Sequence, residues 1–151
     1  MGISLLSALV TSFLATLGFG VLLHAPKRAL VWASLTGMAA NGFYWSLGAA
    51  GASDHAAIFA AAAGAAILAE LLARRMKMAA TIFITLSIIP LVPGLALYRT
   101  MAYFAKGQSQ SGLELGIYAM ITFLLIALGV AMGSFIVRLR AGTNPPSRTR
   151  K

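Results

Sequence analysis

Residues 78–105 read MAATIFITLSIIPLVPGLALYRTMAYFA, and Arg99 is the one charged side chain among these 28 residues. A helix that spans a membrane needs about 20 mainly apolar residues, so the stretch is long enough to cross a bilayer. Pro90 and Pro93, followed directly by Gly94, interrupt a regular helix, because each proline lacks an amide donor and clashes with the preceding turn. The sequence therefore predicts a membrane helix that is broken at Pro90–Gly94.

The composition of the whole chain indicates a lipid environment. Of its 151 residues, 60% are hydrophobic and 10% are charged, whereas soluble domains carry about 25% charged residues. A water-soluble domain of this length could not bury so much apolar surface. The chain has no cysteine, which excludes a disulfide scaffold and thiolate metal sites.

Four further stretches are long and apolar enough to span a bilayer. They are Ile3–Leu23, Ala29–Ala50, His55–Leu72 and Leu113–Val137. The sequence thus predicts an all-α integral membrane protein with five transmembrane helices. We expect one transmembrane domain over residues 1–140 and a disordered basic tail over residues 141–151.

Small residues suggest how two of these helices pack. The third stretch is almost entirely alanine and glycine, which allows close backbone approach and predicts a central position. The fifth contains Gly129 and Gly133 in a GxxxG spacing. Packing within the chain is the favoured interpretation of this spacing, and a subunit interface is the alternative.

The basic residues predict the orientation. The formal net charge is +9, and ten of the twelve Lys and Arg residues fall on one side of a five-span arrangement. These ten are Lys27, Arg28, Arg74, Arg75, Lys77, Arg138, Arg140, Arg148, Arg150 and Lys151. The positive-inside rule then places the N-terminus outside and the C-terminus in the cytoplasm, in a bacterial inner membrane. The clusters are short and lack interleaved aromatic residues, so no nucleic-acid partner is expected.

The break is the candidate binding site. Pro90 lies 13 residues after Lys77 and Gly94 lies 12 residues before Lys106, so the break is near the middle of the span. Irregular backbone at this depth is tolerated only inside protein or beside a cavity. The half-helix that follows Pro93 would point its positive dipole end at a solute carboxylate. We therefore expect Pro90, Pro93, Gly94 and Leu95 to bind a small solute; a simple proline kink is the alternative.

Other polar residues within the spans are weaker candidates. Arg99 could bind a carboxylate or extend toward the membrane surface, and Asn41 could contact solute, although a bond between helices is favoured. Thr85 could line a path or bond to a freed carbonyl. Glu70 stands one turn before Arg74, so a local ion pair is favoured over a proton relay.

Two further features narrow the class of protein. Tyr44 and Trp45 lie near one end of the second stretch, where an interfacial aromatic belt is the favoured interpretation. No metal constellation, catalytic set or phosphate-binding loop is present in the sequence. We expect no enzyme activity, no metal and no cofactor.

Two segments carry a family resemblance. Residues 18–32, GFGVLLHAPKRALVW, and residues 89–94, IPLVPG, with Tyr98-Arg99-Thr100-Met101 after them, resemble the small-subunit half of the threonine/serine exporter family. The likeness extends from the first span to the fifth. It is similar also to the small subunit of the two-component succinate exporter. His24-Ala25 departs from the pattern in the loop before Pro26.

The resemblance implies a subunit of a secondary exporter driven by the proton motive force. Its substrate would be threonine, serine or a small dicarboxylate such as succinate, and Tyr98 would belong to the site. It also implies a larger membrane subunit, again with five spans, as partner; a homo-oligomer is a further alternative. An accessory membrane protein that stabilises a transporter without binding solute is the competing hypothesis.

Overall fold

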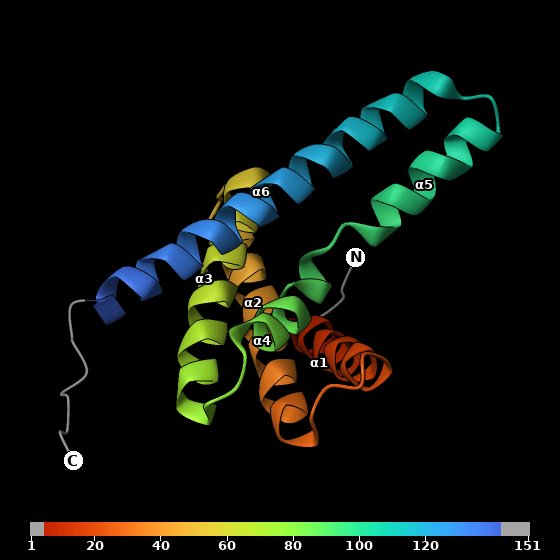
Figure 1. Ribbon diagram of the computed structural model, residues 1–151. Coiled ribbons are helices and arrows are strands. Elements are labelled where there is room, and N and C mark those ends of the chain that lie inside the picture. The colour runs from red at the N-terminus through yellow and green to blue at the C-terminus, as the bar shows by residue number, and fades with distance from the viewer. Residues whose placement is uncertain (1–4, 143–151) are drawn as a thin grey trace, which may run out of the picture.

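The computed structural model describes residues 5–142, which form helices joined by short turns and contain no strand (Figure 1). The helices are α1 (Leu5–Leu22), α2 (Lys27–Ala49), α3 (Asp54–Met76), α4 (Ala80–Ile88), the 3-10 helix η1 (Ile89–Leu91), α5 (Gly94–Ala105) and α6 (Ser109–Gly142). The prediction of an all-α chain is confirmed.

The apolar helices agree in part with the predicted spans. Within residues 5–142, α1, α3 and α6 are long and apolar enough to cross a membrane, and α4–η1 with α5 can form a fourth, bent span. α2 is long enough, at 23 residues, but is not among them. It contains several polar residues, including Ser34, Thr36 and Asn41.

α3 is the central helix, as its small residues predicted. It packs against α2, α4 and α6 and buries a row of alanines: Ala57, Ala61, Ala62, Ala65, Ala66, Ala69 and Ala73. Phe83 and Leu86 of α4 fill the space between the alanines of α2 and those at the end of α3. A helix without large side chains lets its neighbours come close, and here three helices use that access.

The glycine pair of α6 packs inside the chain. A Cβ on Gly129 would lie 2.6 Å from the Phe59 carbonyl oxygen of α3, and one on Gly133 would overlap the Ala63 carbonyl oxygen. The intrachain interpretation of the GxxxG spacing is therefore confirmed. The two helices run in the same direction, because Tyr118 of α6 meets Asp54 at the start of α3 and Arg138 meets Glu70 near its end.

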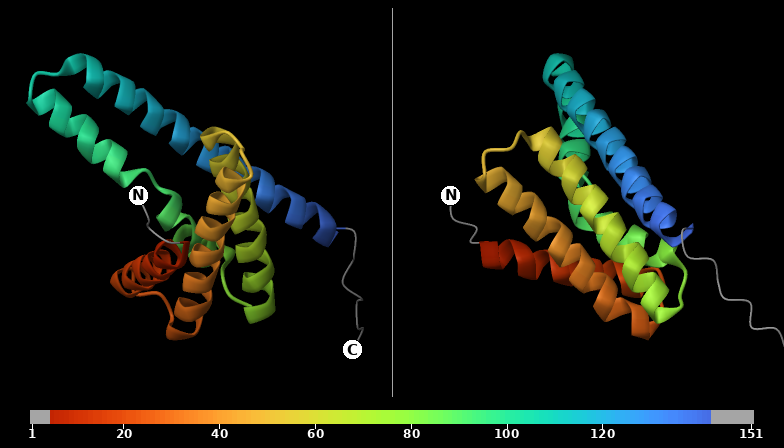
Figure 2. Two further views of the ribbon diagram at one scale, coloured as in Figure 1. Left: turned by 180° about the vertical axis from the view of Figure 1, so that it is seen from behind. Right: turned by 90° about the vertical axis from the view of Figure 1, so that its left-hand side faces the viewer.

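α5 and the first part of α6 form a hairpin that projects from the other helices (Figures 1 and 2). The turn between them is shorter than the predicted loop over 106–112, because α6 already begins at Ser109. α6 also continues past the predicted end at Val137 and past residue 140, to Gly142. The rest of the expected tail, 143–151, lies outside the described residues.

Short caps define the turns around α3. Ser53 accepts a hydrogen bond from the Ala56 amide at 3.4 Å, which satisfies one free donor of the first turn. At the other end Lys77 adopts a left-handed φ of 53°. The Met78 amide then donates to the Ala73 carbonyl at 3.0 Å, so the helix stops abruptly and α4 turns back along it.

Candidate functional site

The predicted break is present where the sequence placed it. α4 ends at Ile88, η1 covers Ile89–Leu91 and α5 starts at Gly94, and the two arms are bent by 54°. Tight turns replace the helical ladder: the Val92 amide donates to Ile89 at 3.2 Å and the Gly94 amide to Val92 at 2.8 Å. Pro93 precedes α5, and no side chain caps the first turn of that helix, as expected from two residues without amide donors.

A cavity of about 200 Å³ lies beside the break. Its lining comes from α2, α3, α6 and the broken segment: Tyr44, Ile58, Pro90, Leu91, Pro93, Tyr118 and Thr122. A water molecule occupies roughly 30 Å³ in the liquid, so the cavity has room for a small organic solute. Irregular backbone inside a membrane is expected where it lines such a space, and Pro90 and Pro93 do so here.

One carboxylate organises the polar wall of this cavity. Asp54, in the first turn of α3, accepts a hydrogen bond at 2.5 Å from the Tyr44 hydroxyl of α2. It accepts a second, also at 2.5 Å, from the Tyr118 hydroxyl of α6. The His55 ring stands edge-on to Tyr118, with centroids 6.0 Å apart. Three helices thus meet at one charge, and hydrogen bonds to a charged group are the strong ones.

A wider hollow of about 450 Å³ lies on the other side of Tyr44. Tyr44 and Asp54 line it together with Trp45, Gly48, Ala49, Ala52 and Ala57. Tyr44 therefore lines both hollows. The group formed by Tyr44, Asp54 and Tyr118, which we call the Asp54 cluster, stands where the two spaces come together.

The predicted site residues after the break do not enter the cavity. Gly94 has no neighbouring atom within 4 Å of where a Cβ would be. Leu95 is 61% exposed and Tyr98 is 71% exposed. Arg99 is exposed too, and it has no hydrogen bond or ion pair among residues 5–142. These four residues lie on the side of α5 that no other described helix covers.

Asn41 and Thr85 lie elsewhere. The Asn41 amide donates to Ser12 Oγ at 2.5 Å and to the Ala8 carbonyl at 3.3 Å, so it joins α2 to α1, as the favoured interpretation had it. Thr85 is exposed and lines a separate hollow with His24 and Ala25. Neither residue reaches the cavity beside the break.

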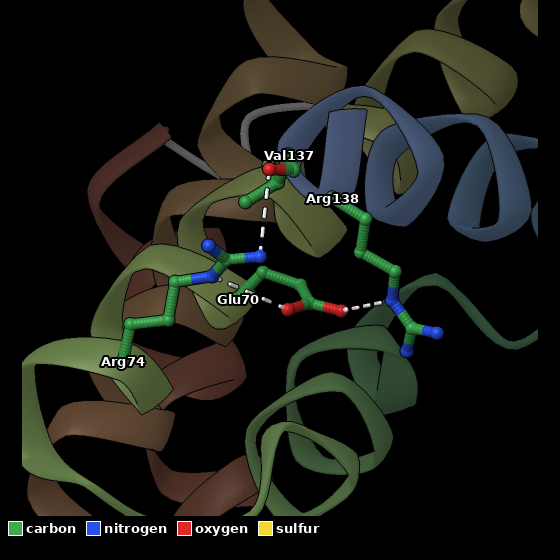
Figure 3. Close-up of polar contacts among 4 residues, drawn as sticks. All are labelled: Glu70, Arg74, Val137 and Arg138. Atoms are coloured by element: carbon green, nitrogen blue, oxygen red, sulfur yellow. Dashed lines mark hydrogen bonds and ion pairs between the residues drawn. The ribbon is translucent and has the colours of Figure 1, made fainter. Parts of the chain in front are cut away.

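Glu70 forms a second charged group, near the end of α3 (Figure 3). Its Oε2 lies 3.9 Å from Arg74 Nε, which confirms the predicted local pair. Its Oε1 lies 3.4 Å from Arg138 Nε of α6, and Arg74 also donates to the Val137 carbonyl at 3.4 Å. The Glu70 group and the Asp54 cluster thus join α3 to α6 at both ends.

A larger hollow, of about 530 Å³, lies between α2 and α3 on their outer side. Its lining is apolar except for Thr36 and Arg75, and the Thr36 hydroxyl is already bonded to Ser87 at 2.7 Å. Binding sites combine a concave surface with a few convergent polar groups, which this groove lacks. Among the residues that the structure describes, no group of three or more His, Asp or Glu side chains could hold a metal ion.

Sequence comparison identifies the family. The family model described as "Threonine/Serine exporter, ThrE" matches residues 8–136. This chain belongs to the threonine/serine exporter family. The matched region includes the break and every residue that lines the cavity beside it.

Two curated members of the exporter family match most of the chain. The "Probable threonine/serine exporter" of Mycobacterium tuberculosis is 34% identical over 114 residues, which cover 75% of this chain and 22% of that protein. The "Threonine/serine exporter" of Corynebacterium glutamicum is 33% identical over 121 residues, covering 80% of this chain and 24% of that protein. The chain thus spans about a quarter of the length of these relatives. No solved structure matches it.

The sequence identified the break but missed the polar wall beside it. Tyr44 had been assigned to an interfacial belt, and Asp54 to a loop. Their separation of 10 residues across a short turn was a usable signal, because two helices in a hairpin bring such residues together. Tyr118 lies 64 residues from Asp54, and no local pattern links them.

Proposed function

We propose that this chain is the membrane-embedded subunit of a secondary exporter that moves threonine, serine or a small dicarboxylate such as succinate out of the cell. The family and the apolar helices support transport of a small molecule across a bacterial membrane. The cavity beside Pro90 and Pro93 carries the proposal. The break interrupts the hydrogen-bond ladder of a span, which is costly in lipid, and an accessory subunit that binds no solute has no need of it.

The proposed site extends from the cavity to the start of α5. The first turn of α5 has no side-chain cap, and uncapped amides with the helix dipole favour a carboxylate. We keep Gly94, Leu95, Tyr98 and Arg99 as residues that meet solute or a partner on the uncovered side of α5. Asn41 and Thr85 take secondary places, since their positions are remote from the cavity.

The arrangement supports five spans. α3 and α6 are parallel, so in a bilayer they begin on the same side, and the chain between them crosses once. A single span broken between α4 and α5 meets this requirement, whereas a re-entrant loop does not. α2 is about 34 Å long, enough for the roughly 30 Å hydrocarbon core. With Arg74, Arg75 and Arg138 at the cytoplasmic end, the N-terminus is outside and the membrane is the bacterial inner membrane.

A larger membrane subunit with five spans is the proposed partner. The curated relatives are several times longer than the matched region, and the uncovered side of α5 carries large apolar side chains such as Leu95 and Met101. In the assembled exporter that side would face the partner, and the lipid bilayer would cover the rest. A homo-oligomer of this chain is the alternative assembly.

Counterflow in proteoliposomes tests the proposal. The chain is purified from its native membranes with any subunit that co-purifies, and again alone, and both samples are loaded with unlabelled threonine or succinate. Uptake of the corresponding labelled solute against the preloaded pool is the expected result. Absence of exchange for both solutes in both samples would favour the accessory function instead.

A further inference from the structure

The hydrogen bonds of the Asp54 cluster determine what the cavity can offer a solute. Tyr44 and Tyr118 each have one hydroxyl proton, and each gives it to Asp54. The Thr122 hydroxyl gives its proton to the Tyr118 carbonyl at 2.9 Å. A hydroxyl whose proton is committed still has lone pairs that accept. All three side-chain oxygens in the cavity lining are therefore acceptors toward its interior.

The same wall lacks positive charge. The remaining lining residues are Ile58, Pro90, Leu91 and Pro93, which bring no charged side chain, and the Asp54 carboxylate stands directly behind the two tyrosines. Hydrogen bonds in a chain polarise one another, so the negative charge makes the tyrosine oxygens better acceptors. A group with several N–H donors and a positive charge fits this wall, whereas a carboxylate meets acceptors and a like charge.

We propose that Asp54, acting with the hydroxyls of Tyr44 and Tyr118, recognises the ammonium group of the solute and makes the site selective for amino acids over dicarboxylates. This inference rests on the proposed function and specifies the substrate class of its site. The α-carboxylate of the amino acid then lies toward the uncapped start of α5. Asp54 is a positioning and specificity residue, because it acts on the solute through the two tyrosines.

Competition for labelled threonine counterflow tests the selectivity. Three unlabelled competitors are compared: threonine, 2,3-dihydroxybutanoate, in which a hydroxyl replaces the ammonium group, and succinate. Hydrogen bonds to a charged group are worth about 10- to 100-fold in affinity, so threonine should compete better than the other two by that factor. In Asp54→Asn this advantage should fall to about 3-fold or less, and in Tyr118→Phe it should fall partway.

Two matched controls separate selectivity from general damage. Glu114→Gln makes the same carboxylate-to-amide change on an exposed residue of α6, and Tyr103→Phe removes a tyrosine hydroxyl from α5 outside the cavity lining. Both variants should keep the full advantage of threonine. A carboxylate that only holds helices together would change the rate or the amount of folded protein and leave the ratio between competitors unchanged.

A thiol-protection measurement covers variants that fold poorly. The chain has no cysteine, so Thr122→Cys places a single thiol in the cavity of an otherwise intact chain. Threonine should slow its modification by a small thiol reagent at least 10-fold more than 2,3-dihydroxybutanoate at equal concentration. Equal protection by the two compounds would contradict ammonium recognition.

The outcomes distinguish this inference from the function on which it rests. If threonine exchanges but Asp54→Asn keeps the wild-type preference, or if succinate competes as well as threonine in the wild type, the inference is wrong and the exporter remains. If neither threonine nor succinate exchanges, the proposed function fails and the inference fails with it. Loss of the preference in Asp54→Asn alone, with both controls intact, supports it.

Discussion

Replacing Gly133 by alanine tests the packing that frames the cavity. A Cβ at this position would lie 2.9 Å from the Ala66 Cβ and would overlap the Ala63 carbonyl oxygen, whereas carbon atoms in good contact are about 3.5–4.0 Å apart. Both neighbours are fixed to the α3 backbone, so no side-chain rotation relieves the overlap. α3 and α6 must separate, and overpacking of this kind costs about 1–3 kcal/mol.

Gly18→Ala is the matched control. Gly18 lies inside α1, and no atom stands within 4 Å of the Cβ that alanine would add. Alanine favours the helix over glycine by about 0.8–1.0 kcal/mol at either position, so the difference between the two variants isolates the overlap. It should appear as a Tm for Gly133→Ala about 2–12 °C below that of Gly18→Ala.

The assay is thermal unfolding in lipid nanodiscs, followed by the fluorescence of Trp32 and Trp45 in α2. Each variant is first checked for equal insertion, so that the comparison concerns folded protein. A Gly133→Ala variant as stable as Gly18→Ala would mean that α3 and α6 do not meet through this glycine face. The parallel pairing of the two helices, and with it the crossing of the chain between them, would then lose its main support.

Three further predictions concern the site and the topology. Gly94→Leu and Arg99→Ala should each lower counterflow several-fold at unchanged membrane insertion; normal transport by both variants would exclude the start of α5 from the site. Asn41→Ala should lower the Tm through loss of a bond between helices worth about 0.6–2 kcal/mol, while the preference for threonine over its competitors stays as in the wild type; a changed preference would return Asn41 to the binding site. In spheroplasts, an impermeant maleimide should label Gln108→Cys and leave Ala79→Cys unlabelled, and equal labelling of the two would indicate a re-entrant loop.

The sequence predicted those parts of the fold that depend on local chemistry. Two prolines and a glycine interrupt a helix whatever surrounds them, so the position of the break followed from residues 90–94 alone. A helix of alanines has to be central because it has little else to contribute, and α3 is. The length of α6 was underestimated, because the polar residues from Ser109 onward suggested a loop although they lie on a helix that extends beyond the bundle.

The site was predicted only where the chain is adjacent in sequence. Pro90 and Pro93 line the cavity, as expected, but the residues opposite them come from three other helices. Tyr118 reaches Asp54 because Gly129 and Gly133 set how closely α6 lies on α3, and that register is a tertiary property. The exposed side of α5, with Tyr98 and Arg99, could not be interpreted from local pattern either, since its surroundings lie outside this chain.

Parallel packing of α3 and α6 joins the topology to the chemistry. Because both helices begin at the same end, the Asp54 cluster gathers at one end of the pair and the Glu70 group at the other. The break lies between them, with Pro90 and Pro93 on the cavity that Tyr44 and Tyr118 also line. A solute in that cavity would meet a negative cluster toward the proposed outer end and, toward the proposed cytoplasmic end, a carboxylate already paired with Arg74 and Arg138. The free acceptors are all on the outer side, so an ammonium group is drawn outward, the direction that export requires.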